Sequence, residues 1–372
     1  MAKKSLLNID GAYRKIKKGF LTVDGIHRKV KKAFITIGGV YHPCWSSGEL
    51  SPSGIMYGFY NNVGRYMMAA TSVGNYALFS GGQNTTNTVY NLVEAFDKTL
   101  ARTLAPNMEA GKYSHAGAHT DDYAIFNGGF PATGNVDAYD SSLAVTFATK
   151  QGVGRYHSAG TQIGGFALFG GGFDSANKVR AEVDVYDNSL AYTHATPLSA
   201  ARQNLGATSV GNYAIFAGGT KVSASDKLST VDAYDTDLAQ TIATPLSNAV
   251  PVRAATSVGN YALFLSNNTS YFNVYVYDKD LTATVLPLTG IKSRAEVAAT
   301  TIGDYGIFVG GNSGATYYKD DFVVNADLTV TNCRSIQYNT RSMTAASIGD
   351  YALFGGGAES TVTSRIEVYY LV

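Results

Sequence analysis

A basic residue followed by an aromatic one recurs along this chain, and this pairing is suited to ligand binding. Guanidinium and ammonium groups bind carboxylates and phosphates, and tyrosine rings offer a flat apolar face for stacking. The spacing predicts a ring of cations able to bind an anionic polymer. The candidate ligand-binding residues are Arg65, Lys112, Arg155, Arg202, Arg294, Arg341, Tyr66, Tyr113 and Tyr156.

The same basic residues also allow a purely structural interpretation. An acidic residue recurs at a fixed place later in most copies of the repeat, and a buried acid could neutralise each cation. These acids are Glu94, Asp137, Asp184, Asp232 and Glu367. The sequence leaves both interpretations open.

Catalytic patterns are weak by comparison. His115 and His157 stand without ligand-spaced partners, and Cys44 and Cys333 are too few for a disulfide framework or a zinc site. A glycosidase needs two carboxylates across a cleft, whereas the acids here follow the repeat. We therefore expect no catalytic residue, no metal, no cofactor and no enzymatic activity, with glycan cleavage the least favoured alternative.

The elements that position these residues come from a repeat whose centre is a tight turn and a short apolar strand, as in Ser72–Gly82. Its anchor aromatics are 43 to 48 residues apart, at Tyr76, Tyr123, Phe166, Tyr213, Tyr261, Tyr305 and Tyr351. Each copy reads as four short strands: a small-residue strand, the apolar strand, a Val-Asp-Ala-Tyr strand and a Thr-x-Ala-Thr strand. Seven such units predict an all-β, seven-bladed β-propeller, which leaves few exposed sheet edges.

Paired glycines end most of the apolar strands, as at Gly81–Gly82 and Gly128–Gly129. Together with the Tyr-Asp that follows the third strand, they resemble the kelch repeat over about residues 60 to 372. The fifth unit departs from this pattern with Ser266–Asn267, and the sole tryptophan is Trp45. The turns between the first two strands are nearly uniform, while the connections after the glycines vary. Variable loops on a regular scaffold indicate the binding face, where Phe130, Phe173, Tyr271, Tyr317, Asn84, Asn87 and Asn268 are further candidates for contacts with sugars.

The first 50 residues form a different module. They hold ten Lys and Arg against three acids, a net charge of +7, whereas the rest of the chain carries −6. A 14-residue repeat contains Asp-Gly or Gly-Gly between β-branched residues, which predicts two-residue hairpin turns. This module resembles the short basic repeats at the start of phage and prophage structural proteins. That resemblance implies docking on other virion proteins through Arg14, Lys15, Lys17, Lys18, Arg28, Lys29, Lys31 and Lys32.

Domain bounds follow from composition. Residues 1–45 are the expected attachment module, 46–54 a Ser/Gly/Pro-rich linker, and 55–372 the propeller. The seventh unit lacks a fourth strand, so we expect residues 55–60 to supply it and close the ring. Only Leu6–Leu7 follow the first lysines before polar residues, so no export signal is expected, and no apolar stretch approaches the length of a membrane helix.

These patterns lead to one functional hypothesis. The chain is expected to be a phage or prophage virion protein, anchored by its N-terminus, whose propeller binds a host-surface ligand such as an envelope polysaccharide. Several copies per particle would strengthen weak contacts. The alternative is a capsid or tail decoration or adaptor protein with no receptor. Nucleic acid is not an expected partner, because no groove-reading element accompanies the basic run.

Overall fold

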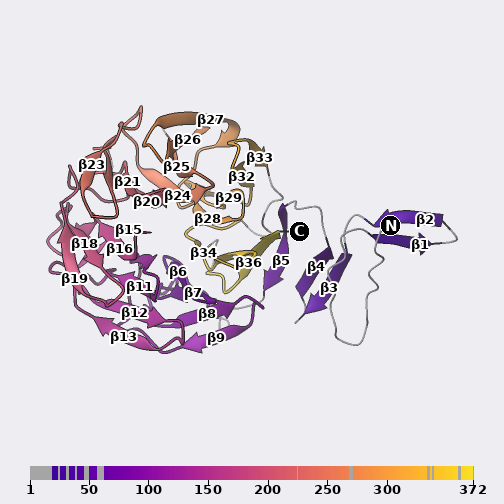
Figure 1. Ribbon diagram of the computed structural model, residues 1–372. Coiled ribbons are helices and arrows are strands. Elements are labelled where there is room, and N and C mark those ends of the chain that lie inside the picture. Colours follow the sequence, from indigo (N-terminus) through magenta and orange to yellow (C-terminus); the bar gives the residue numbers. More distant parts are fainter. Residues whose placement is uncertain are drawn as a thin grey trace.

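The computed structural model describes residues 19–23, 26–30, 33–37, 40–45, 50–56, 63–223, 225–267, 271–332, 336, 339–358 and 362–371. Within these ranges the structure is all-β and contains seven four-stranded antiparallel sheets. Figure 1 shows the sheets arranged around a central axis, as the repeat predicts. We call the sheets blades 1 to 7 in chain order. The described part of the chain contains no helix with the length and apolar character needed to cross a membrane.

Blades 1 to 6 pair their strands in sequence order from the axis outward, and in blade 7 the outermost strand comes from the N-terminal part of the chain. Blades 1 to 4 are β6 (Ala69–Val73), β7 (Tyr76–Ser80), β8 (Val93–Asp97) and β9 (Arg102–Ala105); β10 (Ala116–His119), β11 (Tyr123–Asn127), β12 (Val136–Asp140) and β13 (Val145–Ala148); β15 (Ala159–Ile163), β16 (Phe166–Gly170), β18 (Val183–Tyr186) and β19 (Tyr192–Ala195); and β20 (Gly206–Val210), β21 (Tyr213–Ala217), β22 (Val231–Tyr234) and β23 (Gln240–Ile242).

Blades 5 to 7 are more varied in strand length. They are β24 (Val252–Val258), β25 (Tyr261–Asn267), β26 (Tyr271–Asp278) and β27 (Ala283–Lys292); β28 (Ala298–Ile302), β29 (Tyr305–Val309), β32 (Asp321–Asn325) and β33 (Val330–Asn332); and β34 (Thr344–Ile348), β35 (Tyr351–Gly355), β36 (Ile366–Leu371) and β5 (Leu50–Met56). Two short ladders lie in loops, β14 (Arg155–Tyr156) with β17 (Phe173–Asp174) and β30 (Asn312–Ser313) with β31 (Thr316–Tyr317).

The innermost strands alternate between buried and half-buried residues because one side packs between blades and the other faces the axis. The axis side carries small residues where the blades converge. A Cβ on Gly117 would lie 2.7 Å from the carbonyl oxygen of Ala70, and one on Gly160 would lie 2.6 Å from that of Gly117. Close approach of neighbouring inner strands thus explains the small-residue pattern of the first strand.

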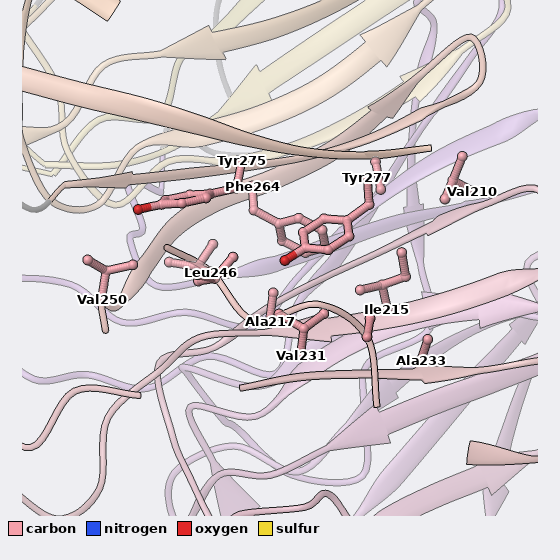
Figure 2. Packing of buried hydrophobic residues seen from close by; sticks show 13 residues of the cluster. Val210, Ile215, Ala217, Val231, Ala233, Leu246, Val250, Phe264, Tyr275 and Tyr277 are labelled. Atoms are coloured by element: carbon pink, nitrogen blue, oxygen red, sulfur yellow. The ribbon is translucent and has the colours of Figure 1, made fainter. Parts of the chain in front are cut away.

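The core lies between blades. Between blades 4 and 5, Ile215 and Val231 pack with Phe264 and Tyr277 of the next sheet, as Figure 2 shows. The second strand of each blade is buried on both faces, since each sheet is covered by a sheet on either side. Burying one large apolar side chain contributes about 1.5–3 kcal/mol, so each of these interfaces adds substantially to stability.

The ring closes through the N-terminal part of the chain, but earlier than the sequence predicts. Strand β5 (Leu50–Met56) pairs with β36, with Leu50 opposite Leu371 and Met56 opposite Ile366. The expected strand at 55–60 therefore begins inside the expected 46–54 linker, and residues 57–60 lie outside the described residues. Pro52 fits here because β5 is the outer edge of its sheet, where a missing N–H need not break a ladder; the ladder is irregular between Glu367 and Tyr369.

Two hairpins precede the propeller and form separate two-stranded sheets. They are β1 (Gly19–Val23) with β2 (Ile26–Val30), and β3 (Ala33–Ile37) with β4 (Val40–Trp45). Their strand ends flank the turns predicted at Asp24–Gly25 and Gly38–Gly39, which themselves lie outside the described residues. Arg28 and Lys29 lie in β2. The other attachment candidates, Arg14, Lys15, Lys17, Lys18, Lys31 and Lys32, lie outside the described residues.

Candidate functional site: the mouth of the central channel

One end of the propeller carries the variable loops and the start of every inner strand; we call it the loop face. Blade 5 rises furthest on this side. It has Ser266 where other blades have the first glycine, so β25 continues to Asn267 and pairs onward with β26. Strand β27 extends with them, and Tyr271 on this hairpin is exposed. The longer strands of blade 5 therefore make the loop face uneven.

On the loop face, a ring of residues with left-handed backbone surrounds the propeller axis, and we call this axial region the mouth. Their φ values lie between 52° and 56°, and they are Met67, Ser114, His157, Asn204, Glu296 and Ser342. We call these the mouth ring. Backbone hydrogen bonds join its neighbours: the N–H of Ser114 donates to the Met67 carbonyl at 2.9 Å, and that of His157 to the Ser114 carbonyl at 3.1 Å. Blade 5 interrupts the ring, because Val252 at this place belongs to the extended strand β24.

The candidate cations of blades 1 to 4 are buried. Their side chains are at most 2% exposed, and each is ion-paired with the third-strand acid of its own blade. The pairs are Arg65–Glu94 at 2.5 Å, Lys112–Asp137 at 2.6 Å, Arg155–Asp184 at 2.6 Å and Arg202–Asp232 at 2.6 Å. The prediction of a ring of cations that binds an anionic polymer is therefore wrong for these four residues, and the structural alternative accounts for them.

Each buried pair connects several segments. Arg202 also donates to the carbonyl of Phe216 at 3.1 Å, and Asp232 accepts from the backbone N–H of Ser199, in the loop before blade 4, at 2.9 Å. Burial lowers the pKa of Arg202, and the charge of Asp232 partly offsets this effect. Losing either partner would leave a buried charge without compensation, which is costly. These groups hold the loop face in place and are inaccessible to a ligand.

Blades 5 to 7 lack this arrangement. Blade 5 has Val250 where the other blades place the cation, and it is buried. In blade 6, Arg294 is buried, donates to the carbonyl of Asp320 at 2.7 Å and lies 4.9 Å from the ring centre of Tyr318. Arg294 is therefore also inaccessible to a ligand. Its acidic partner, Asp320, lies in the loop before the third strand of the blade instead of in that strand.

Arg341 occupies a different position from the other candidates. It forms an isolated bridge with Ala358, as Tyr66 does with Gln83 and Tyr113 with Phe130. Its place in blade 7 therefore corresponds to the tyrosines, while Thr340 holds the place of the buried cation. The side chain of Arg341 is 30% exposed and pairs with Glu296, which is 32% exposed, at 3.2 Å. Of the six basic candidates, Arg341 alone remains accessible.

Two of the three tyrosine candidates, Tyr113 and Tyr156, form part of an aromatic arc along blades 2 and 3. The arc consists of Tyr113, Phe130, Tyr156 and Phe173, with successive ring centres 5.3, 5.5 and 5.6 Å apart. Phe130 is 43% exposed and the two tyrosines are half-buried. The pKa of the Tyr113 hydroxyl is raised by burial and by the nearby Tyr66 and Tyr156 hydroxyls. The structure therefore brings the three candidate tyrosines together at the mouth.

Comparisons with known proteins point to the fold. No family model matches the chain, and no curated protein matches it. Among solved structures it is similar to YjhT. The match has a TM-score of 0.56 and 14% sequence identity, and it covers 71% of this chain and 99% of YjhT. At that identity the likeness supports the β-propeller architecture and says nothing about what this chain binds.

The histidines near the mouth have structural surroundings. His115 is buried, and its Nε2 lies 2.7 Å from the hydroxyl of Ser80. Burial lowers its pKa well below the usual value, with Lys112 and Arg65 adding to the effect, so the ring is neutral. Burial also lowers the pKa of His157. No group of three His, Cys, Asp or Glu able to hold a metal occurs among the described residues.

The remaining sugar-contact candidates are scattered. The side-chain oxygen of Asn84 accepts from the backbone N–H groups of Thr86 and Thr88, so it shapes its own turn. Asn87 has a left-handed backbone in the same turn, and Asn268 lies outside the described residues. Tyr317 lies 5.7 Å from the guanidinium of Arg341. The sequence predictions did not include Glu296. It directly follows the blade 6 residue that aligns with Tyr66, and this position is the signal that could have identified it.

Proposed function

We propose that the propeller is a glycan-binding display domain and that its aromatic arc contacts the sugar. The observation that carries this proposal is the row of partly exposed rings at the channel mouth, on the face with the variable loops. Rings held in edge contact lose little conformational freedom on binding, and their exposed faces suit the apolar faces of pyranose rings. The burial of the cations on blades 1 to 4 shifts the expected recognition from charge to stacking.

The wider setting remains part of this proposal. The propeller belongs to a phage or prophage virion protein whose basic N-terminal repeats dock on acidic surfaces of other virion proteins. The support is the charge asymmetry of the sequence and the two hairpins before the ring. Isolated hairpins of this length are marginally stable, so a neighbouring protein would complete them. The ligand is then a bacterial envelope polysaccharide, bound through many copies on one particle.

The test is glycan binding by the full chain, with variants that separate the arc from other exposed rings. Phe130→Ala and Tyr156→Ala should each weaken binding about tenfold, because each removes a stacking surface. Phe147→Ala is the matched control. Phe147 lies on β13 of blade 2 and is 54% exposed, away from the mouth. Equal losses in all three variants, or none in the arc variants, would refute the proposal.

A separate variant tests attachment of the chain to the virion through its N-terminal repeats. Replacing Lys17, Lys18, Lys31 and Lys32 by Glu should abolish incorporation into particles while glycan binding is retained. A particle that incorporates the chain normally but whose propeller binds no glycan would favour the decoration or adaptor alternative. Release of reducing sugar from a bound glycan would favour an enzyme.

A further inference from the structure

We propose that the channel mouth selects acidic sugars and that Arg341 binds the negatively charged group, a carboxylate or a phosphodiester. This inference rests on the proposed glycan-binding function and names the class of glycan. Its starting point is the one-residue offset of Arg341 in its blade. The offset gives Arg341 the backbone position that Tyr66 and Tyr113 hold in their blades, whereas Arg65, Arg155 and Arg202 are in the core.

The contacts of Arg341 leave part of its guanidinium available. Nη1 donates to both carboxylate oxygens of Glu296, at 3.3 and 3.2 Å. Within the described residues, Nη2 has no acceptor. The buried Arg202 differs, because its Nη2 donates to Asp232 and Phe216 and its Nη1 to Ala200. Nη2 of Arg341 therefore has two N–H groups that can donate hydrogen bonds to a ligand oxygen.

The carboxylate of Glu296 acts on more than one cation. Arg253, in the neighbouring blade 5, is half-buried, and the charge of Glu296 opposes the lowering of its pKa by burial. The same carboxylate pairs with Arg341. A monoanionic group on a ligand would add charge-assisted hydrogen bonds to Nη2 of Arg341.

An aromatic ring beside Arg341 supplies a surface for the sugar. Tyr317, in β31, has its ring centre 5.7 Å from the guanidinium of Arg341. Its side chain is half-buried, as those of Tyr113 and Tyr156 are. A sugar whose charged group contacts Arg341 therefore has the Tyr317 ring beside it, so that charge and stacking act on the same residue of the glycan.

The experiment uses the full chain on an array of acidic oligosaccharides. Some carry uronic acids and others phosphodiesters, and each is printed beside its uncharged counterpart, such as the carboxyl-reduced form. The wild type should prefer the charged form of at least one pair about tenfold. The uronic acid and phosphodiester arms identify which anion is recognised. Preference should decline as salt is raised, because the pair is half-exposed.

Two variants separate ligand recognition from a structural role of the ion pair. Arg341→Gln should abolish the preference for the charged form and keep binding to the neutral one. Glu296→Gln should strengthen binding to the charged form severalfold, because it removes the competing carboxylate. Lys279→Gln is the charge-matched control, since Lys279 is exposed in the turn after β26, at the opposite end of the propeller.

The outcomes distinguish the two proposals. Equal binding to charged and neutral forms would overturn the role of Arg341 and leave the glycan-binding function standing. Weakening of acidic-glycan binding by both Arg341→Gln and Glu296→Gln would assign the pair a structural role and also overturn the inference. Absence of binding to every glycan would overturn both proposals together.

Discussion

Blades 1 to 4 and blades 5 to 7 share one strand order but use their charged residues differently. In the first four, a cation and an acid are buried together at the start of each blade. In the last three, the corresponding places hold Val250, Arg294 and Thr340, and ion pairing shifts to Asp320 or to the half-exposed Glu296. Charged groups thus support the regular blades from within and reach solvent where the repeat changes.

Under the proposed function, departures from the repeat carry the information about binding. A residue kept at one place in successive blades, such as Arg65 or Arg202, is explained by the packing that every blade needs. A residue moved by one position, such as Arg341, is freed from that packing and is 30% exposed. Three stability measurements test this comparison, from the largest expected effect to the smallest.

Removing a buried cation should cost more stability than removing the exposed one. Arg202→Met leaves Asp232 buried without its charge partner, so we expect a loss of about 3–5 kcal/mol in the free energy of unfolding. Arg341→Gln should change it by at most about 1 kcal/mol, because its pair is half-exposed. Urea unfolding of both variants checks this contrast. Similar losses in the two variants would show that blades 1 to 4 and blades 5 to 7 do not differ in this way.

Blade 6 should respond to pH through Asp321. This carboxyl occupies the place that Val93 and Val136 hold in other blades, is 3% exposed and accepts a hydrogen bond from the Tyr369 hydroxyl. Burial raises its pKa to about 8. Because its pKa in the unfolded chain is about 4, folding favours the protonated form. That stability is fully present below about pH 4 and is lost as pH rises to about 8, by up to about 1.4 kcal/mol per pH unit.

The Asp321→Asn variant isolates this effect. An amide keeps an acceptor for the Tyr369 hydroxyl and cannot ionise, so the free energy of unfolding should fall less between pH 6 and pH 8 than in the wild type. Denaturant unfolding at several pH values measures the two slopes. Parallel slopes would mean that Asp321 does not ionise differently in the folded state.

The smallest effect concerns a hydrogen bond repeated between blades. The Tyr186 hydroxyl donates to the carbonyl of Thr149, in the loop before its blade, at 2.7 Å, and Tyr277 makes the same bond to Thr244 at 2.7 Å. Blade 1 has Phe96 at this place. Tyr186→Phe should cost about 1 kcal/mol, measurable as a shift of the urea midpoint. Loss of several kcal/mol would instead indicate repacking of the interface.

Much of the fold could be predicted from the sequence because its signals are local and repeated. Strand β7 begins at Tyr76 as predicted, and the glycine pairs coincide with the ends of their strands. A Cβ on Gly128 would lie 2.2 Å from the carbonyl oxygen of Arg155, which explains why a glycine recurs there. The bounds of the closing strand were harder to predict, because an edge strand such as β5 needs little side-chain pattern to pair.

The site was less predictable because side-chain direction depends on register. A shift of one residue in a strand moves a side chain to the opposite face, so Arg65 and Arg341 look alike in the sequence and differ in burial. The sequence also supports the alternative that acids neutralise the cations, since Glu94 and Asp137 recur with the blades. The pairing of each strand decides between the ligand-binding and the structural interpretation, and residue spacing alone does not give that pairing.

The position of β5 beside β36 also has a consequence for biosynthesis. The strand leaves the ribosome early, but its partner follows about 300 residues later. At about 5–20 residues per second, the closing strand waits some 15 to 60 s for the far end of the chain. During that time the growing arc of sheets stays open, and any prematurely ended product keeps an uncovered blade face at each end of the arc. Synthesis of the chain as far as β36 thus decides whether the ring can close.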